Sequence, residues 1–87
     1  MQIILYNCNL FADQTVRVFD TDKNEIVYTQ PIDLEDTAPM ICALANRLNI
    51  SEVKISGNKE YATPLIEEIK TTYSLSYGNN NINVEVI

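Results

Sequence analysis

The chain has 87 residues, of which 46% are hydrophobic and 21% are charged, and its formal net charge is −6. This length allows one hydrophobic core, and the composition is that of a globular domain, which excludes a disordered chain. The six Lys and Arg residues are scattered and never adjacent, so no basic stripe is present for binding DNA or RNA. No apolar stretch approaches the roughly 20 residues that span a bilayer, and no signal peptide is recognisable, so we expect a cytosolic protein without membrane contact.

The N-terminal part of the chain has the pattern of three strands. Residues 2–7 contain an unbroken apolar run, which is typical of a central strand covered on both faces. Residues 15–20 and 25–30 alternate between apolar and polar side chains, as half-buried strands do. The polar group at 20–24 favours a tight turn between them. We therefore expect an antiparallel three-stranded meander.

A helix is predicted after Pro31, which ends the third strand. Asp33 is a candidate N-cap, with Asp36 as its capping-box partner. Because proline is tolerated only in the first helical turn, Pro39 moves the expected start of the regular helix to Thr37 or Ala38. Asn49 is the expected end. One apolar stripe runs along this helix and consists of Ile41, Leu44, Ala45 and Leu48.

The C-terminal half predicts a strand, a helix and a closing strand. The strand at 53–56 ends at Gly57, and either Asn58 or Thr63 caps the following helix. The last strand alternates over 82–87. The expected order is β-β-β-α-β-α-β, an α/β (α+β) fold in one domain over residues 1–87, with a mixed five-stranded sheet and two helices.

The residue types exclude several chemistries. The chain has no histidine, which removes the commonest general base, the Ser–His and Cys–His pairs and the commonest zinc ligand. Cys8 and Cys42 are too few for a thiolate zinc site, and we expect reduced thiols, with a disulfide between the two as the alternative. With two glycines, neither a Walker A motif nor a GxGxxG loop is possible. We expect no cofactor.

Carboxylates remain as candidate catalysts or Mg²⁺ ligands, in two clusters. Asp20 and Asp22 belong to a predicted turn, where aspartate is favoured by its own local hydrogen bonds. Asp33, Glu35 and Asp36 precede a predicted helix, where acids complement the helix dipole. Each cluster therefore has a structural explanation, and we assign no catalytic or metal-binding residue.

Three other features are candidates for binding. Tyr73, Tyr77 and Leu75, near the end of the second helix, predict an apolar patch for a protein partner. The closing strand is a candidate edge for strand addition between chains. The strand–helix junction Gly57–Asn58 is a weak candidate for an anion site, since backbone amides are free at a helix start. The residues of the candidate interaction surface are Tyr73, Leu75, Tyr77, Ile82, Val84 and Val86.

The stretch Val-Arg-Val-Phe-Asp-Thr-Asp-Lys-Asn-Glu-Ile-Val at 16–27, with the order of elements, resembles the opening hairpin of the ribonuclease-H-like superfamily, which includes the actin-like ATPases. The resemblance implies metal-dependent nuclease or nucleotide-phosphate chemistry, carried by an acid in the first strand and another near the end of the fourth. Here Asn7 stands at the first position, and the fourth strand ends in Ile55, Ser56 and Gly57 without an acid. The chain is also similar to short acidic proteins of bacteriophages and prophages.

Three functions follow in order of preference. The first is a non-enzymatic interaction or assembly protein, which self-associates or, as a phage-encoded acidic inhibitor, occupies a basic surface of a host protein. The alternative is a residual Mg²⁺-dependent hydrolase or nucleotide-binding domain that uses Asp20, Asp22 or Asp36. The third is a binder of small anions at Gly57 and Asn58.

Overall fold

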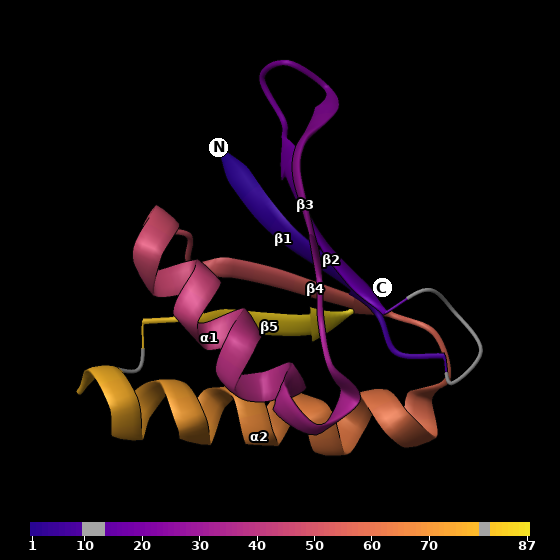
Figure 1. Ribbon diagram of the computed structural model, residues 1–87, viewed down its shortest axis with the longest axis vertical. Coiled ribbons are helices and arrows are strands. Elements are labelled where there is room, and N and C mark those ends of the chain that lie inside the picture. Colours follow the sequence, from indigo (N-terminus) through magenta and orange to yellow (C-terminus); the bar gives the residue numbers. More distant parts are fainter. Residues whose placement is uncertain (10–13, 79–80) are drawn as a thin grey trace.

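The computed structural model describes residues 1–9, 14–78 and 81–87. Its elements follow the predicted order, and Figure 1 shows their arrangement. The strands are β1 (Gln2–Asn7), β2 (Thr15–Asp20), β3 (Glu25–Pro31), β4 (Glu52–Ser56) and β5 (Asn83–Val86). The helices are the short 3₁₀ helix η1 (Leu34–Asp36), α1 (Thr37–Leu48) and α2 (Lys59–Tyr77).

The five strands form one mixed sheet in the order β3-β2-β1-β4-β5. β1 pairs with β2, and β2 with β3, in antiparallel fashion, while β1–β4 and β4–β5 are parallel pairs. This follows from the connections, because a short turn reverses the chain whereas a crossover helix returns it to the same direction. The predicted mixed sheet is confirmed.

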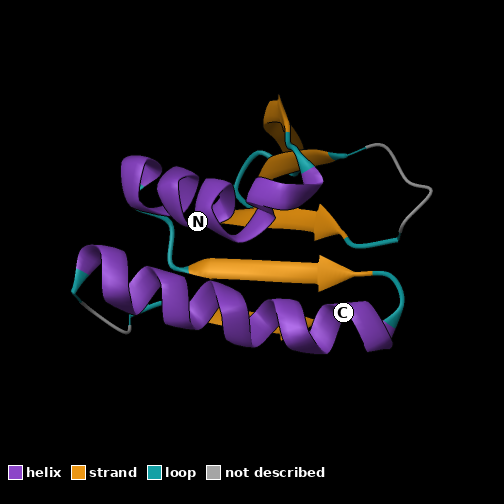
Figure 2. Cartoon of the chain, turned by 60° about the horizontal axis from the view of Figure 1, so that its bottom comes forward, coloured by secondary structure: helices purple, strands orange, loops and turns teal. Residues whose placement is uncertain are grey.

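Both helices cover the same face of the sheet (Figure 2). Alternation along β1 and β2 sends Ile4, Val16 and Val18 to this face, where each is at most 1% exposed. From the helices, Ile41 and Ile69 complete the core with 0% exposure. β1 is the central strand of the sheet, as predicted. On its opposite face, where no helix of the described chain lies, Ile3 is buried and Leu5 is half-buried, so the covering predicted for that face is only partial. The continuous apolar run does not reveal this difference.

α1 begins at Thr37, one of the two starts, Thr37 and Ala38, that the position of Pro39 predicts. The predicted capping box does not form, because η1 precedes the helix and neither Asp33 nor Asp36 makes a side-chain cap hydrogen bond. The helix ends at Asn49, whose φ of 56° is left-handed and whose backbone N–H bonds to the carbonyl oxygens of the last turn. This end was predicted from the residue type.

α2 begins one turn before Pro64, since its N-cap is Asn58 and not Thr63. The Asn58 side chain accepts a hydrogen bond from the Glu60 N–H at 2.9 Å. Pro64 lies inside the helix, where it removes one intrahelical hydrogen bond. Gly78 ends the helix with a φ of 67°. None of the described helices is long and apolar enough to cross a membrane.

Candidate functional site: the β5 edge and the ends of the parallel strands

Among the described strands, β5 is one of the two at the edges of the sheet, and it pairs with β4 alone. The Asn83 N–H donates to the Ser51 carbonyl oxygen at 2.7 Å, and the Ile87 N–H to that of Ile55 at 2.9 Å. Because hydrogen-bonding direction alternates along a strand, the N–H and C=O groups of Val84 and Val86 point away from β4. The outer side of β5 therefore offers donors and acceptors in the arrangement that another strand pairs with.

Four polar side chains lie beside this edge on the face that the helices leave open. The Asn83 amide donates to the Glu52 carboxylate at 3.1 Å, and the Lys54 ammonium pairs with the Glu85 carboxylate. Both pairs join residues that are opposite each other in the β4–β5 register. Alternation along the two strands predicts that these four residues share one face of the sheet. It does not predict which of them are neighbours, because that depends on the parallel pairing of β4 with β5.

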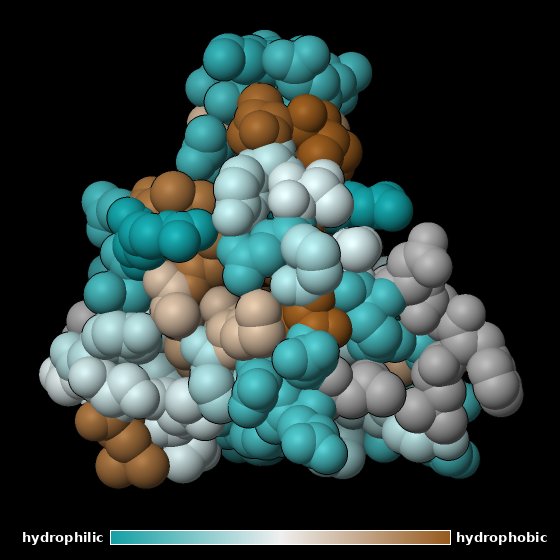
Figure 3. Space-filling model, in the orientation of Figure 1, coloured by the Kyte–Doolittle hydropathy of each residue, from teal (hydrophilic) through white to brown (hydrophobic). Residues whose placement is uncertain are grey.

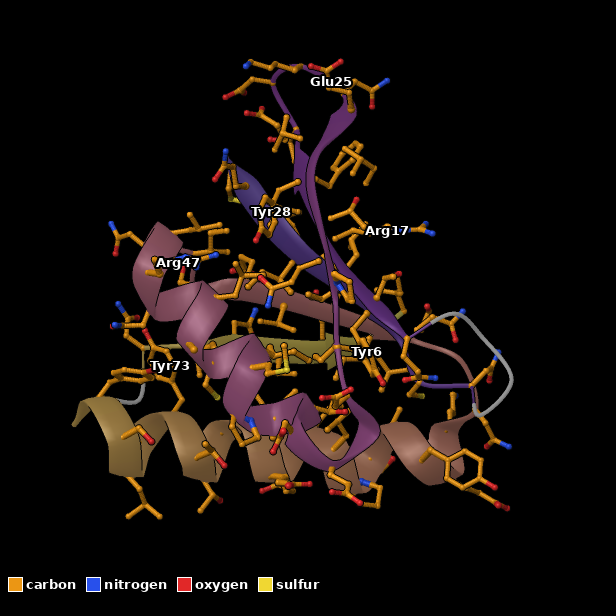
Figure 4. The ribbon with its side chains drawn as sticks, viewed as in Figure 1. Tyr6, Arg17, Glu25, Tyr28, Arg47 and Tyr73 are labelled. Atoms are coloured by element: carbon orange, nitrogen blue, oxygen red, sulfur yellow. The ribbon has the colours of Figure 1, made fainter. Side chains whose placement is uncertain are left out.

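The predicted tyrosine patch is largely internal. Tyr73 is 7% exposed, and its ring lies 5.2 Å from that of the half-buried Tyr77, centroid to centroid. Figure 4 shows Tyr73 on the side of α2 that faces the sheet. Leu75 is 82% exposed and projects from the helix apart from them. Tyr73 thus packs in the core, because its spacing from Ile69 places it on the buried stripe of α2.

The side chains of the predicted edge strand also point inward. Ile82 is 7% exposed, Val84 is 4% exposed, and Val86 packs against the core. β5 therefore presents its outer backbone and the open-face side chains of Asn83 and Glu85, while its valines anchor it to α2 and the core. Binding through this strand stays a prediction.

β3, the other edge strand, has two features that hinder pairing. Its register with β2 shifts between Val18 and Phe19, so Val27 is an extra residue of a β-bulge. Pro31 lacks an N–H at the far end of the strand. Bulges and prolines are the usual protection of sheet edges. The protection matters here because Ile26 and Val27 are 43% and 38% exposed, and Figure 3 shows hydrophobic surface near the outer end of this hairpin.

Asparagine side chains join the carboxyl ends of β1 and β4. The Asn9 Oδ1 atom accepts a hydrogen bond from the Asn58 N–H at 3.0 Å, and Asn7 Oδ1 accepts one from the Asn9 N–H at 2.9 Å. Gly57 has a φ of 110°, and an added Cβ atom would lie 2.9 Å from Asn9 Oδ1. The Asn58 amide of the predicted anion site therefore already has a partner, and anion binding there stays a prediction.

The residues at the predicted superfamily acid positions are neighbours. Asn7 and Ser56 are register partners at the ends of β1 and β4, and neither is a carboxylate. Among the residues that the structure describes, no three His, Cys, Asp or Glu side chains are grouped to hold a metal ion. Asp20 instead accepts hydrogen bonds from the Asp22 and Lys23 N–H groups, while Asp22 pairs with the N-terminal amine at 3.0 Å.

A shallow hollow of about 280 Å³ lies on the open face near these strand ends. Arg17 and Lys54 line it from the strands on either side of Leu5, since both are register partners of that residue. Thr15 and Asn7 add a hydroxyl and an amide to the lining. This arrangement brings together two of the six cationic side chains of the protein, and the spacing along the chain did not predict it.

Cys8 and Cys42 are both free and buried. The predicted reduced state is therefore the one found, and the alternative disulfide is not formed. The Cys42 thiol donates to the Ile69 carbonyl oxygen at 3.3 Å. Burial raises the pKa of Cys42 to about 11, with a smaller contribution from the negative charge of Glu68. Burial also raises the pKa of the Cys8 thiol. Both cysteines are therefore core residues with little thiolate character.

Comparison with known proteins supports the fold. No protein-family model matches the chain, and no curated protein matches it. Among solved structures, the chain is similar to an exopolyphosphatase from Cytophaga hutchinsonii ATCC 33406, with a TM-score of 0.51 and 16% sequence identity. The likeness covers all of this chain and 34% of that one, so the chain spans about a third of its length. At this identity the likeness concerns the fold alone, which is ribonuclease-H-like.

Proposed function

We propose that this domain is a non-enzymatic interaction or assembly protein that binds another polypeptide through the outer edge of β5. The observation that carries the proposal is the contrast between the two sheet edges. β3 is hindered by a bulge and by Pro31, whereas β5 contains neither and directs the backbone groups of Val84 and Val86 outward. Strand addition to such an edge combines main-chain hydrogen bonds with contacts from the alternate side chains.

The ends of β1 and β4 also favour binding over catalysis. Asn7 and Ser56 cannot supply the negative charge that holds Mg²⁺. The Asn7 side chain instead accepts from the Asn9 N–H, and the Asn9 side chain accepts from the Asn58 N–H across the two strand ends. The acidic balance of the chain suits a partner with a basic surface, such as a host protein bound by a phage-encoded inhibitor.

The test uses two substitutions at one position. Val86→Pro removes the outward N–H, while Val86→Ala removes most of the side chain and keeps the N–H. Each variant, immobilised beside the wild type, is used to capture proteins from a lysate of the cells that produce the domain, and circular dichroism checks its folding. We expect partners to be retained by the wild type and Val86→Ala and lost with Val86→Pro.

Two outcomes contradict the proposal. Equal capture by all three folded proteins would exclude the β5 edge as the binding surface. A wild-type protein that is monomeric and captures nothing would contradict an interaction function altogether. Leu75→Ser is a further arm, because loss of partners with this variant alone would move the surface to α2, where Leu75 is 82% exposed.

A second candidate function is the binding of phosphate-type anions or residual hydrolysis. Two observations favour it: the hollow lined by Arg17 and Lys54, and the similarity of the fold to that of an exopolyphosphatase. It predicts that inorganic polyphosphate raises the melting temperature of the wild type and not that of Arg17→Ala. A nucleotide panel with and without Mg²⁺ extends the test to the hydrolase alternative. Equal melting temperatures in every condition would remove both forms of this candidate.

A further inference from the structure

We infer that the strand which adds to β5 is β5 of a second copy of this chain, in antiparallel register about Val84. This inference rests on the proposed function and names its partner. The outer edge of β5 is suited to it, because the strand carries Asn83 and Glu85 on the open face and its valines stay in the core. Two copies related by a two-fold axis present the same edge to each other and join their sheets into one.

Hydrogen-bonding direction limits the possible registers. The outward groups belong to Val84 and Val86, so an antiparallel partner must place outward residues opposite outward residues. Centring the pair on Val84 brings Val84 opposite its own copy and Val86 opposite Ile82 of the second copy. It also brings Asn83 opposite Glu85 of the second copy on the open face.

The polar side chains beside the edge favour this register. Asn83 uses one of its two amide hydrogens on Glu52, which leaves a second hydrogen that can be donated to Glu85 of the second copy. Glu85 accepts from Lys54 within its own chain and has a further oxygen to accept from that amide. A continuous row of polar side chains then crosses the junction, from Lys54 and Glu85 of one copy to Asn83 and Glu52 of the other. The two-fold axis repeats this row in the opposite direction.

The neighbouring register is disfavoured by charge. Centring the pair on Glu85 also satisfies the hydrogen-bonding direction, but it places two Glu85 carboxylates directly opposite each other. Like charges in a cross-strand pair are destabilising. An approach through β3 would lose hydrogen bonds at the bulge and at Pro31.

Cysteine cross-linking tests the register directly. In the proposed pair, residues 83 and 85 of opposite chains form a non-hydrogen-bonded pair with Cα atoms about 4.5 Å apart, within the about 4.4–6.8 Å that a disulfide spans. Residue 83 lies about 8 Å from its own copy, as does residue 85, which is too far. Both native side chains are exposed, and the buried native thiols give little background.

The variants are Asn83→Cys, Glu85→Cys and the double variant, each oxidised with glutathione disulfide and analysed on a non-reducing gel. We expect a covalent dimer with the double variant and at most traces with either single variant. A covalent dimer with Glu85→Cys alone would overturn the Val84 register. Absence of a dimer in all three, with each variant folded by circular dichroism, would overturn pairing through β5.

Light scattering of the wild type over a range of concentrations separates this inference from the proposed function. A concentration-dependent dimer together with the expected cross-link pattern supports a second copy as the partner. A monomer at every concentration overturns the second copy, and the capture experiment with Val86→Pro and Val86→Ala then decides whether the same edge binds a different protein.

Discussion

The backbone N–H of Asn58 donates to the Oδ1 atom of Asn9 at 3.0 Å, although the two residues are 49 positions apart in the chain. The contact joins the end of β1 to the start of α2, and the adjacent Gly57 packs closely against the Asn7 and Asn9 side chains. The superfamily resemblance implies acids near these strand ends, which the sequence lacks, and Gly57–Asn58 was the candidate anion site. The asparagines instead form a structural junction between two parallel strands.

Gly57→Ala should therefore destabilise the domain more than Gly78→Ala. Both glycines have positive φ, but an added Cβ atom at Gly57 would lie 2.9 Å from Asn9 Oδ1, whereas nothing lies within 4 Å of one at Gly78. We expect Gly78→Ala to lower the free energy of unfolding by about 1 kcal/mol and Gly57→Ala to lower it clearly further. Urea unfolding of the two variants measures this, and equal midpoints would show that the junction is not tight.

Asn58→Ala should cost about 1 kcal/mol through loss of the N-cap of α2, which corresponds to a fall in melting temperature of about 4–8 °C for a domain of this size. Asn58→Asp keeps an acceptor for the Glu60 N–H and serves as the matched control. A melting temperature that falls equally in both variants would mean that the cap bond does not stabilise the helix.

The fold was predictable because its signals are local. Alternation predicted β2, and helical spacing predicted the buried stripe of α1 except for Leu48, which is 38% exposed. The fixed φ of Pro39 placed the start of that helix at Thr37 or Ala38, and it begins at Thr37. The N-cap of α2 was left between Asn58 and Thr63, because Pro64 suits the first turn equally well in sequence. A tertiary contact from Asn9 resolves that choice, and no local pattern contains it.

The candidate site was predictable only as a segment. The alternation of Ile82, Val84 and Val86 identified the closing strand, but it could not show that these side chains point into the core and that the backbone remains outside. The pairing of Asn83 with Glu52 depends on the parallel register of β4 and β5, which brings together residues 31 positions apart. The exposure of Leu75 apart from Tyr73 likewise follows from the rotation of α2 against the sheet.

Acid should weaken the hairpin turn through Asp20. Hydrogen bonds from the Lys23 and Asp22 N–H groups, with nearby positive charge, hold the pKa of Asp20 below its ordinary value of 3.8. A lowered folded-state pKa means that the contribution to stability is complete above pH 3.8 and is lost as the pH falls through the folded-state value. Asp20→Asn should therefore flatten the dependence of the urea midpoint on pH between about 4 and 2. If the urea midpoint of Asp20→Asn depends on pH as that of the wild type does, other carboxyl groups cause the dependence.

Cys42 should react with a thiol reagent only when the domain opens. Its pKa of about 11 leaves almost no thiolate at pH 8, and the thiol is 1% exposed. Alkylation of Cys42, followed by mass spectrometry at increasing urea, should track global unfolding. Rapid labelling in native buffer would show that α1 separates from α2 well below the unfolding midpoint.

Self-association through β5 should strengthen as salt is added. Each copy carries a formal charge of −6, so two copies repel one another over distances that salt screens. The contacts at the edge are backbone hydrogen bonds and the amide of Asn83, which depend little on ionic strength. Sedimentation at about 50 and 500 mM salt should give a larger dimer fraction at the higher value. A smaller fraction would indicate an interface held by ion pairs.

The central claim, that the outer edge of β5 pairs with another strand, is tested most directly by residue-resolved amide hydrogen exchange. The N–H groups of Asn83 and Ile87 are bonded to the carbonyl oxygens of Ser51 and Ile55 in the isolated domain, so they should be protected at every concentration. Those of Val84 and Val86 should exchange rapidly in the dilute protein and become protected as concentration rises or a captured partner is added. If Val84 and Val86 still exchange rapidly in a complex shown by light scattering to be fully formed, the claim is contradicted and another surface binds.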